Sequence, residues 1–208
     1  MTDAGRDGGG DGSAGYGPTA LLLGLVAYGE LSAFTQLAAD ARRSPDLAGR
    51  AELATLAAVE MDHYVRVRDH LAARDVDVLD VMAPFVARVD SLLRSVGARD
   101  WPEALVATAL GRGLVTDLQS EALEGLSGAE AELVGEVIAE TGHGAFVESR
   151  LREACEDPQV HARLAMWGRR LLGEALAAVV EGTSGSARAA VLKRLKSQHN
   201  KRVSRLGL

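Results

Sequence analysis

Apolar residues recur every three or four positions along most of the chain, which is the spacing of one face of an α-helix. No stretch alternates apolar and polar residues as a half-buried strand would. Breaks in the pattern divide the chain into successive helices. They are expected at about 19–43, from 45 to about 74, at about 78–96, from 102 to about 126, from 128, from 158 and after 185.

Local signals support these boundaries. Ser44-Pro45-Asp46 interrupts the first helix, and a proline is well suited to the start of the next. Asp100 precedes Trp101-Pro102 as an N-cap, and Ser127-Gly128-Ala129-Glu130 matches a capping box. Residues 1–17 are rich in Gly, Asp and Ser and are expected to form a disordered tail. Residues 18–208 are expected to form a single helical domain.

Composition agrees with an all-α fold. Aromatic residues make up only 4% of the 208 residues, and there are 5 prolines. The single Cys155 excludes an intrachain disulfide framework and fits a reducing compartment. No uninterrupted apolar run reaches about 18 residues, so no membrane span is expected. A signal peptide is not expected either, which leaves the cytoplasm as the predicted location.

Several ionisable residues interrupt the apolar helix faces. Glu30 lies in one such face, and two Glu-x-x-His motifs lie in others, Glu60 with His63 and Glu140 with His143. Residues three apart share a helix face, so each motif can direct both side chains to one point. A helix bundle with two such motifs, and a lone carboxylate from each of two other helices, builds a di-iron or di-manganese site. Metal ions would also remove the cost of burying these carboxylates.

Helix register suggests which acids face each other. Glu30 lies 14 residues before Ser44 and Glu60 lies 15 after Pro45, so in an antiparallel hairpin both are about 21–23 Å from the turn. In the second hairpin, Asp117 matches the level of Glu140 to within about 6 Å, whereas Glu121 misses it by about 12 Å. Asp117 is therefore the predicted fourth lone ligand, and Glu121 is held in reserve. The competing interpretation is a polar-cored bundle with buried salt bridges.

The formal charge of −6 is unevenly distributed. No acidic residue follows Glu181, and seven basic residues do: Arg188, Lys193, Arg194, Lys196, Lys201, Arg202 and Arg205. A basic terminal helix on an acidic body could bind nucleic acid. The alternative is a solvated helix face whose cations favour the C-terminal end of the helix dipole.

With these residues placed, the chain resembles the ferritin-like superfamily and, more narrowly, actinobacterial 2-methylthio-isopentenyladenosine tRNA hydroxylase-like proteins. The resemblance extends from about residue 21 to residue 208. It rests on these segments: Ala27-Tyr28-Gly29-Glu30-Leu31, Glu60-Met61-Asp62-His63, Met82-Ala83-Pro84-Phe85, Thr116-Asp117-Leu118, Glu140-Thr141-Gly142-His143, Trp167-Gly168-Arg169-Arg170 and Arg205-Leu206-Gly207-Leu208. Leu118 and Gln119 stand where the family usually has an aromatic pair.

The resemblance implies a ferritin-like four-helix bundle with extra connecting and C-terminal helices. It also implies a metal-binding site with six ligands: Glu30, Glu60, His63, Asp117, Glu140 and His143. Two iron ions would be the cofactor, with manganese as the other candidate, since carboxylate-rich sites accept either according to supply.

The function expected from the resemblance is that of an oxidoreductase, a non-haem di-iron monooxygenase with molecular oxygen as co-substrate. An external electron donor would be required, because no flavin or nicotinamide motif is present. The implied substrate is the isopentenyl group of a modified tRNA adenosine, with the basic C-terminal helix holding the tRNA.

Two alternatives remain open. The first is a di-metal protein that oxidises or stores iron or scavenges peroxide without hydroxylating anything. The second is a metal-free structural or interaction protein on the same frame. The oligomeric state is also open, with a dimer as one option.

Overall fold

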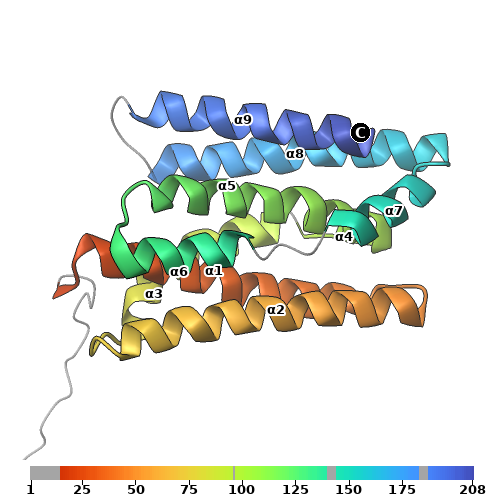
Figure 1. Ribbon diagram of the computed structural model, residues 1–208. Helices are drawn as coiled ribbons and strands as arrows, with labels where there is room; N and C mark the ends of the chain where they lie inside the picture. The colour runs from red at the N-terminus through yellow and green to blue at the C-terminus, as the bar shows by residue number, and fades with distance from the viewer. Residues whose placement is uncertain (1–14, 96, 140–143, 183–186) are drawn as a thin grey trace, which may run out of the picture.

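The described residues of the computed structural model form helices and contain no strand, as predicted for an all-α protein (Figure 1). The description covers residues 15–95, 97–139, 144–182 and 187–208. Most of the predicted N-terminal tail and the whole second Glu-x-x-His motif therefore lie outside it. The helices run roughly along a common direction, so side chains from several of them can meet in one interior.

The first hairpin consists of α1 (Pro18–Ala41) and α2 (Leu47–Ala72), joined by a short turn. Pro18 opens α1, where its missing N–H is not needed. Asp46 caps α2, and its carboxylate accepts a 2.7 Å hydrogen bond from the Gly49 amide. The predicted helices at about 19–43 and 45–74 are therefore confirmed to within about two residues.

The remaining helices follow the predicted order with two differences. They are α3 (Val78–Ser95), α4 (Trp101–Val106), α5 (Arg112–Leu123), α6 (Gly128–Ala139), α7 (Gly144–Ala154), α8 (Pro158–Gly182) and α9 (Ala187–Leu206). The predicted helix from 102 to 126 contains a one-turn π-helix, η2 (Ala107–Gly111), between α4 and α5. The predicted helix that begins at residue 128 is described as two, α6 and α7, on either side of residues 140–143.

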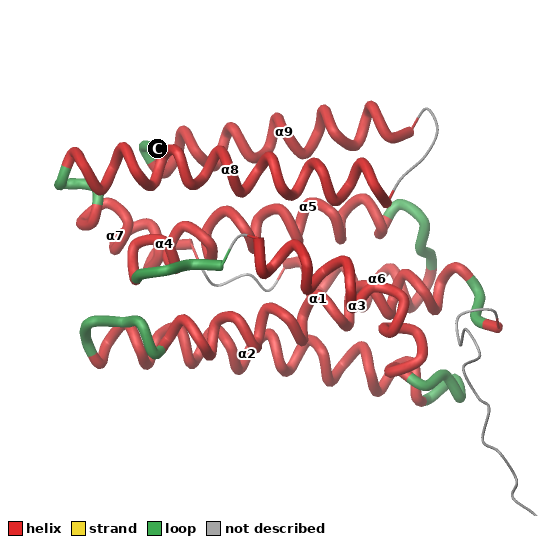
Figure 2. Tube along the Cα trace, turned by 180° about the vertical axis from the view of Figure 1, so that it is seen from behind, coloured by secondary structure: helices red, strands yellow, loops and turns green. Residues whose placement is uncertain are grey.

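Helix α5 lies between two helical pairs. The views from both sides show α1 and α2 along one edge of the bundle and α8 and α9 along the opposite edge, with α4 and α5 between them (Figure 2). Residue contacts join α5 to α1 on one side and to α9 on the other. Helix α5 therefore has two packing faces, one for α1 and one for α9.

Apolar clusters occupy both ends of the α1–α2 hairpin. One contains Leu23, Val26 and Ala27 of α1 with side chains of α2, α3 and α6. Another lies near the turn and contains Leu37, Leu53 and Leu56. Glu30, Glu60 and His63 lie between the two clusters in sequence on both helices. The hairpin therefore carries a buried polar layer with apolar packing above and below it.

Helix α1 is the described helix that is long and apolar enough to cross a membrane, judged by length and composition alone. Buried helices of globular proteins pass the same test. Here α1 packs against α2 and α3 and carries the buried Glu30. In the apolar window of α1, 33% of the residues are buried, and the buried residues of the helix include Leu23, Val26 and Ala27.

The close approach of α1 to α3 depends on Gly24. A Cβ at Gly24 would lie 2.3 Å from the Val81 carbonyl oxygen, so backbone would have to move. We expect Gly24→Ala to lower the free energy of unfolding by about 1–3 kcal/mol. Urea denaturation measures this change.

Gly173→Ala is the matched control, because Gly173 lies in α8 and a Cβ added there would meet no neighbouring atom within 4 Å. It should be neutral or stabilise by about 0.4–1 kcal/mol, since alanine reduces the freedom of the unfolded chain. Equal effects of the two substitutions would contradict the close α1–α3 contact.

Candidate metal centre

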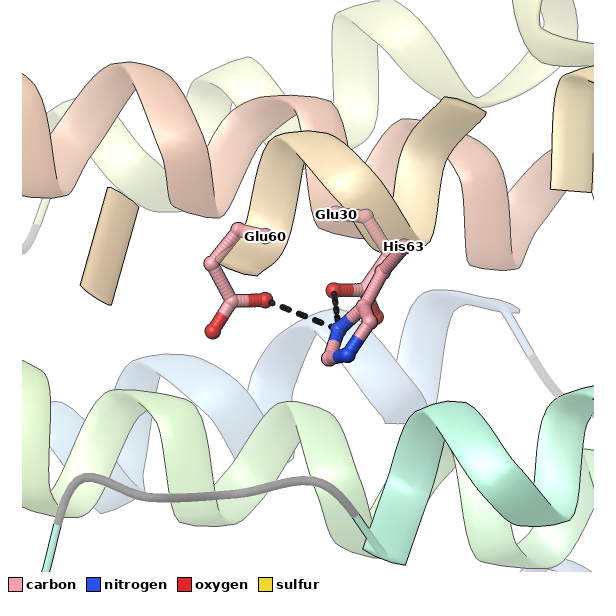
Figure 3. A group of neighbouring side chains, drawn as sticks. All are labelled: Glu30, Glu60 and His63. Carbon is pink, nitrogen blue, oxygen red and sulfur yellow. Dashed lines mark hydrogen bonds and ion pairs between the residues drawn. The ribbon is translucent and has the colours of Figure 1, made fainter. Parts of the chain in front are cut away.

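Three buried side chains of the first hairpin converge on one point. Glu30 comes from α1, and Glu60 and His63 come from consecutive turns of α2 (Figure 3). All three residues have 0% exposure. The His63 Nδ1 atom lies 3.3 Å from Glu30 Oε2 and 3.7 Å from Glu60 Oε2. The register predicted for the hairpin is therefore confirmed, because it brings Glu30 and Glu60 to the same level.

Helix α5 supplies two further polar groups to this cluster. The Arg112 guanidinium bridges the two carboxylates, with Nη2 3.1 Å from Glu30 Oε2 and 2.8 Å from Glu60 Oε2. The Gln119 side-chain amide donates a short hydrogen bond to Glu30 Oε1. Arg112 and Gln119 are seven residues apart and so share one face of α5. That face is directed at the α1–α2 hairpin.

Burial dominates the electrostatics of the cluster. It raises the pKa of the Glu30 carboxyl above its ordinary value, and the neighbouring Glu60 adds to the rise. The hydrogen bond with His63 and the charge of Arg112 act in the opposite direction and lower that pKa. Two carboxylates this close in a dry interior need a cation beside them. Arg112 provides one such cation.

The cluster has the donor atoms and the spacing of a metal site. One ligand atom from each of Glu30, Glu60 and His63 lies within 4.8 Å of the others, so a single ion could contact all three. Carboxylate oxygen with imidazole nitrogen suits iron or manganese. Because the carboxylates are buried, a bound cation that neutralises their charge would stabilise them. These residues therefore fit a metal ion.

The other predicted ligands are not part of this cluster in the described structure. The Asp117 carboxylate is held by both terminal nitrogens of Arg202 in α9, at 2.5 and 2.7 Å. Glu121, the reserve ligand, pairs with Arg194 of the same helix. Glu140 and His143 lie outside the described residues, so their predicted role stays a prediction.

The position of Asp117 departs from the sequence prediction for a physical reason. The apolar series Leu110, Gly113, Leu114 was expected to carry Asp117 toward the metal site. Instead, this stripe faces α8 and α9, where Leu110 packs near Gly168 and Gly113 leaves room for Arg202. Helix α5 has a second buried face, and the polar residues on that face meet Glu30.

Sequence reasoning missed Arg112 and Gln119. One signal was available, because Arg112 and Asp117 are the only charged residues between Leu105 and Leu118. An arginine in such an apolar stretch needs a buried acidic partner. Gln119, which replaces part of the aromatic pair usual in the resembling family, was the other visible departure.

Comparison with known families agrees with the fold. A family model described as "Ferritin-like domain, actinomycetes" matches residues 17–193, most of the chain. The match supports the ferritin-like resemblance and does not extend to the narrower tRNA hydroxylase-like group. No curated protein matches the chain.

The ion pair of Asp117 leads to a prediction that distinguishes two roles for this residue: a metal ligand, as predicted from the sequence, or a partner of Arg202 alone. We expect Asp117→Asn to leave Mn²⁺ affinity unchanged, because this carboxylate is engaged by Arg202. The variant should lose about 1–3 kcal/mol of stability through the weakened charge-assisted pair. Calorimetric titration with Mn²⁺ and urea denaturation measure the two effects.

Glu60→Gln serves as the comparison, since Glu60 belongs to the buried cluster and should be needed for metal binding. A loss of Mn²⁺ affinity in Asp117→Asn as large as that in Glu60→Gln would show that Asp117 is a ligand after all.

Proposed function

The chain belongs to the ferritin-like domain family of actinomycetes, and we propose that it binds a pair of metal ions through its buried acidic residues. The observation that carries this proposal is the convergence of Glu30, Glu60 and His63 at 0% exposure. Glu140 and His143, predicted from sequence, would complete the pair as the second Glu-x-x-His motif. Iron is the proposed metal, with manganese as the substitute that supply could favour.

The finer proposal is an oxygen-dependent monooxygenase. An iron pair, when bound, supplies oxygen activation, and an external donor provides the electrons. The chain's own residues would bind the metal ions and keep water away from them. Glu30 and Glu60 would bind through oxygen and His63 through nitrogen, while Gln119 orients the Glu30 carboxylate. The apolar clusters on both sides of the polar layer would exclude water.

A non-hydroxylating di-metal protein is the second candidate, and the ion pairs of α9 favour it. Arg194, Arg202 and Arg205 bind Glu121, Asp117 and Glu148, respectively. Much of the basic C-terminal helix is thus engaged within the molecule, which leaves less charge for tRNA. Iron oxidation or peroxide removal would need the same buried ligands and no nucleic-acid surface. Either function is proposed for the cytoplasm.

Metal content and oxygen reactivity test the first proposal. The wild-type protein, produced with adequate iron, should hold two irons per chain and change its optical spectrum when oxygen meets the reduced form. We expect Glu60→Ala and His143→Ala to abolish two-metal occupancy while the helical circular dichroism stays unchanged. Two irons per chain retained in both variants would refute the ligand assignment.

Three lysines of α9 are the residues left to test for tRNA binding. Lys193, Lys196 and Lys201 are exposed, and no ion pair is found for them within the described residues. If α9 holds tRNA, Lys193→Glu with Lys196→Glu should weaken tRNA binding at low salt by about tenfold or more, and should flatten the salt dependence. Filter binding across a salt series measures both effects.

Arg42→Glu with Arg50→Glu is the control, because it changes charge equally at exposed positions around the α1–α2 turn. Equal weakening by both double variants would mean that net charge alone is responsible. Unchanged binding in the lysine variant would remove α9 from the proposed function.

A further inference from the structure

A groove lies on the side of Arg112 away from the hairpin. It runs between η2 and α5 on one side and α7 and α9 on the other, and has a volume of about 220 Å³. This volume corresponds to roughly seven water molecules in the liquid. The groove lining includes Thr108, Thr116 and Glu148, and it contains three arginines: Arg112, Arg202 and Arg205.

The groove adjoins a larger one. A cavity of about 540 Å³ shares Glu148, Arg205 and Leu206 with it and reaches Cys155 and His161 near the C-terminus. Arg112 lines the smaller groove, so a small molecule bound there would lie beside its side chain. The same side chain contacts the Glu30–Glu60 pair.

Arg112 is only partly satisfied in this position. Its terminal nitrogens bind the two carboxylates, yet its Nε is buried and has no hydrogen-bond partner within the described residues. The whole residue is 9% exposed. A buried guanidinium with a spare donor beside a cavity is a ready partner for an oxyanion.

A metal ion and Arg112 would bind the same two carboxylates. A metal ion held by Glu30 and Glu60 would compete with the guanidinium for their negative charge. Arg112 would then be a buried cation whose partners had been taken, which is costly. An oxyanion in the groove would remove that cost by pairing with Arg112 from the other side.

We propose that the groove beside Arg112 binds a small oxyanion, and that this binding and metal binding at Glu30, Glu60 and His63 favour each other. The inference rests on the metal binding proposed above. Arg112 neutralises the carboxylates when metal is absent and binds the anion when metal is present. A carboxylate-bearing or sulfate-like small molecule is the expected ligand, positioned at the edge of the metal site by Arg112, because Arg202 and Arg205 already pair with Asp117 and Glu148.

Mn²⁺ affinity of the whole protein, measured by calorimetry at constant ionic strength, tests this coupling. We expect wild-type affinity to rise by about fivefold or more when chloride is replaced by acetate or by sulfate. Acetate alone acting would identify a carboxylate site, sulfate alone a tetrahedral-anion site, and each supports the coupling. Arg112→Met should abolish the anion effect, and the exposed Arg42→Met should preserve it.

The reciprocal measurement needs no variant. Saturating Mn²⁺ should tighten sulfate or acetate binding to the wild-type protein by the same factor, since linkage is symmetric. Mn²⁺ binding that is independent of both anions in the wild type would overturn the inference and leave the proposed metal site standing. An anion effect retained in Arg112→Met would also overturn it. Failure of the wild type to bind Mn²⁺ at all would refute the metal site itself and the coupling with it.

Discussion

The ion pair between Arg112 and the two carboxylates of the α1–α2 hairpin is the interaction on which the centre of the molecule depends. Glu30 and Glu60 are fully buried, and an uncompensated charge in that position would cost several kcal/mol. Arg112 of α5, a helix that packs against α1, reaches both acids at 2.8–3.1 Å. The same arrangement accounts for the composition of α5, which places one cation and one amide in an otherwise apolar face.

Helix α5 also determines how the C-terminal pair is attached. Its opposite face carries Asp117, which binds Arg202 of α9, and Gly113, whose lack of a side chain admits the same arginine. Part of the positive charge on α9 is thus used in ion pairs that attach this helix to the rest of the molecule. A basic terminal helix therefore does not require a nucleic-acid partner to explain it, and the chemistry proposed for the chain rests on its buried acids.

Periodicity predicted the long helices α1 and α2 well, because their buried residues repeat at the helical spacing. The register of Glu30 and Glu60 was also predictable, since a short antiparallel hairpin leaves little freedom. The pairing of Asp117 with Arg202 was not predictable from one apolar stripe, because α5 has two buried faces and this stripe lies on the face toward α8 and α9. The apolar periodicity did not indicate the π-helix at Ala107–Gly111. The only sign of the buried role of Arg112 was its position as a charged residue in an apolar stretch.

A crystal structure of the wild-type protein soaked in Mn²⁺, with anomalous data collected, tests the central claim most directly. We predict an anomalous peak in contact with Glu30, Glu60 and His63, with the Arg112 guanidinium drawn away from the carboxylates toward the groove. Crystals that show no peak there, with Arg112 still bridging Glu30 and Glu60, would contradict it. The buried acids would then form a purely structural ion-pair network.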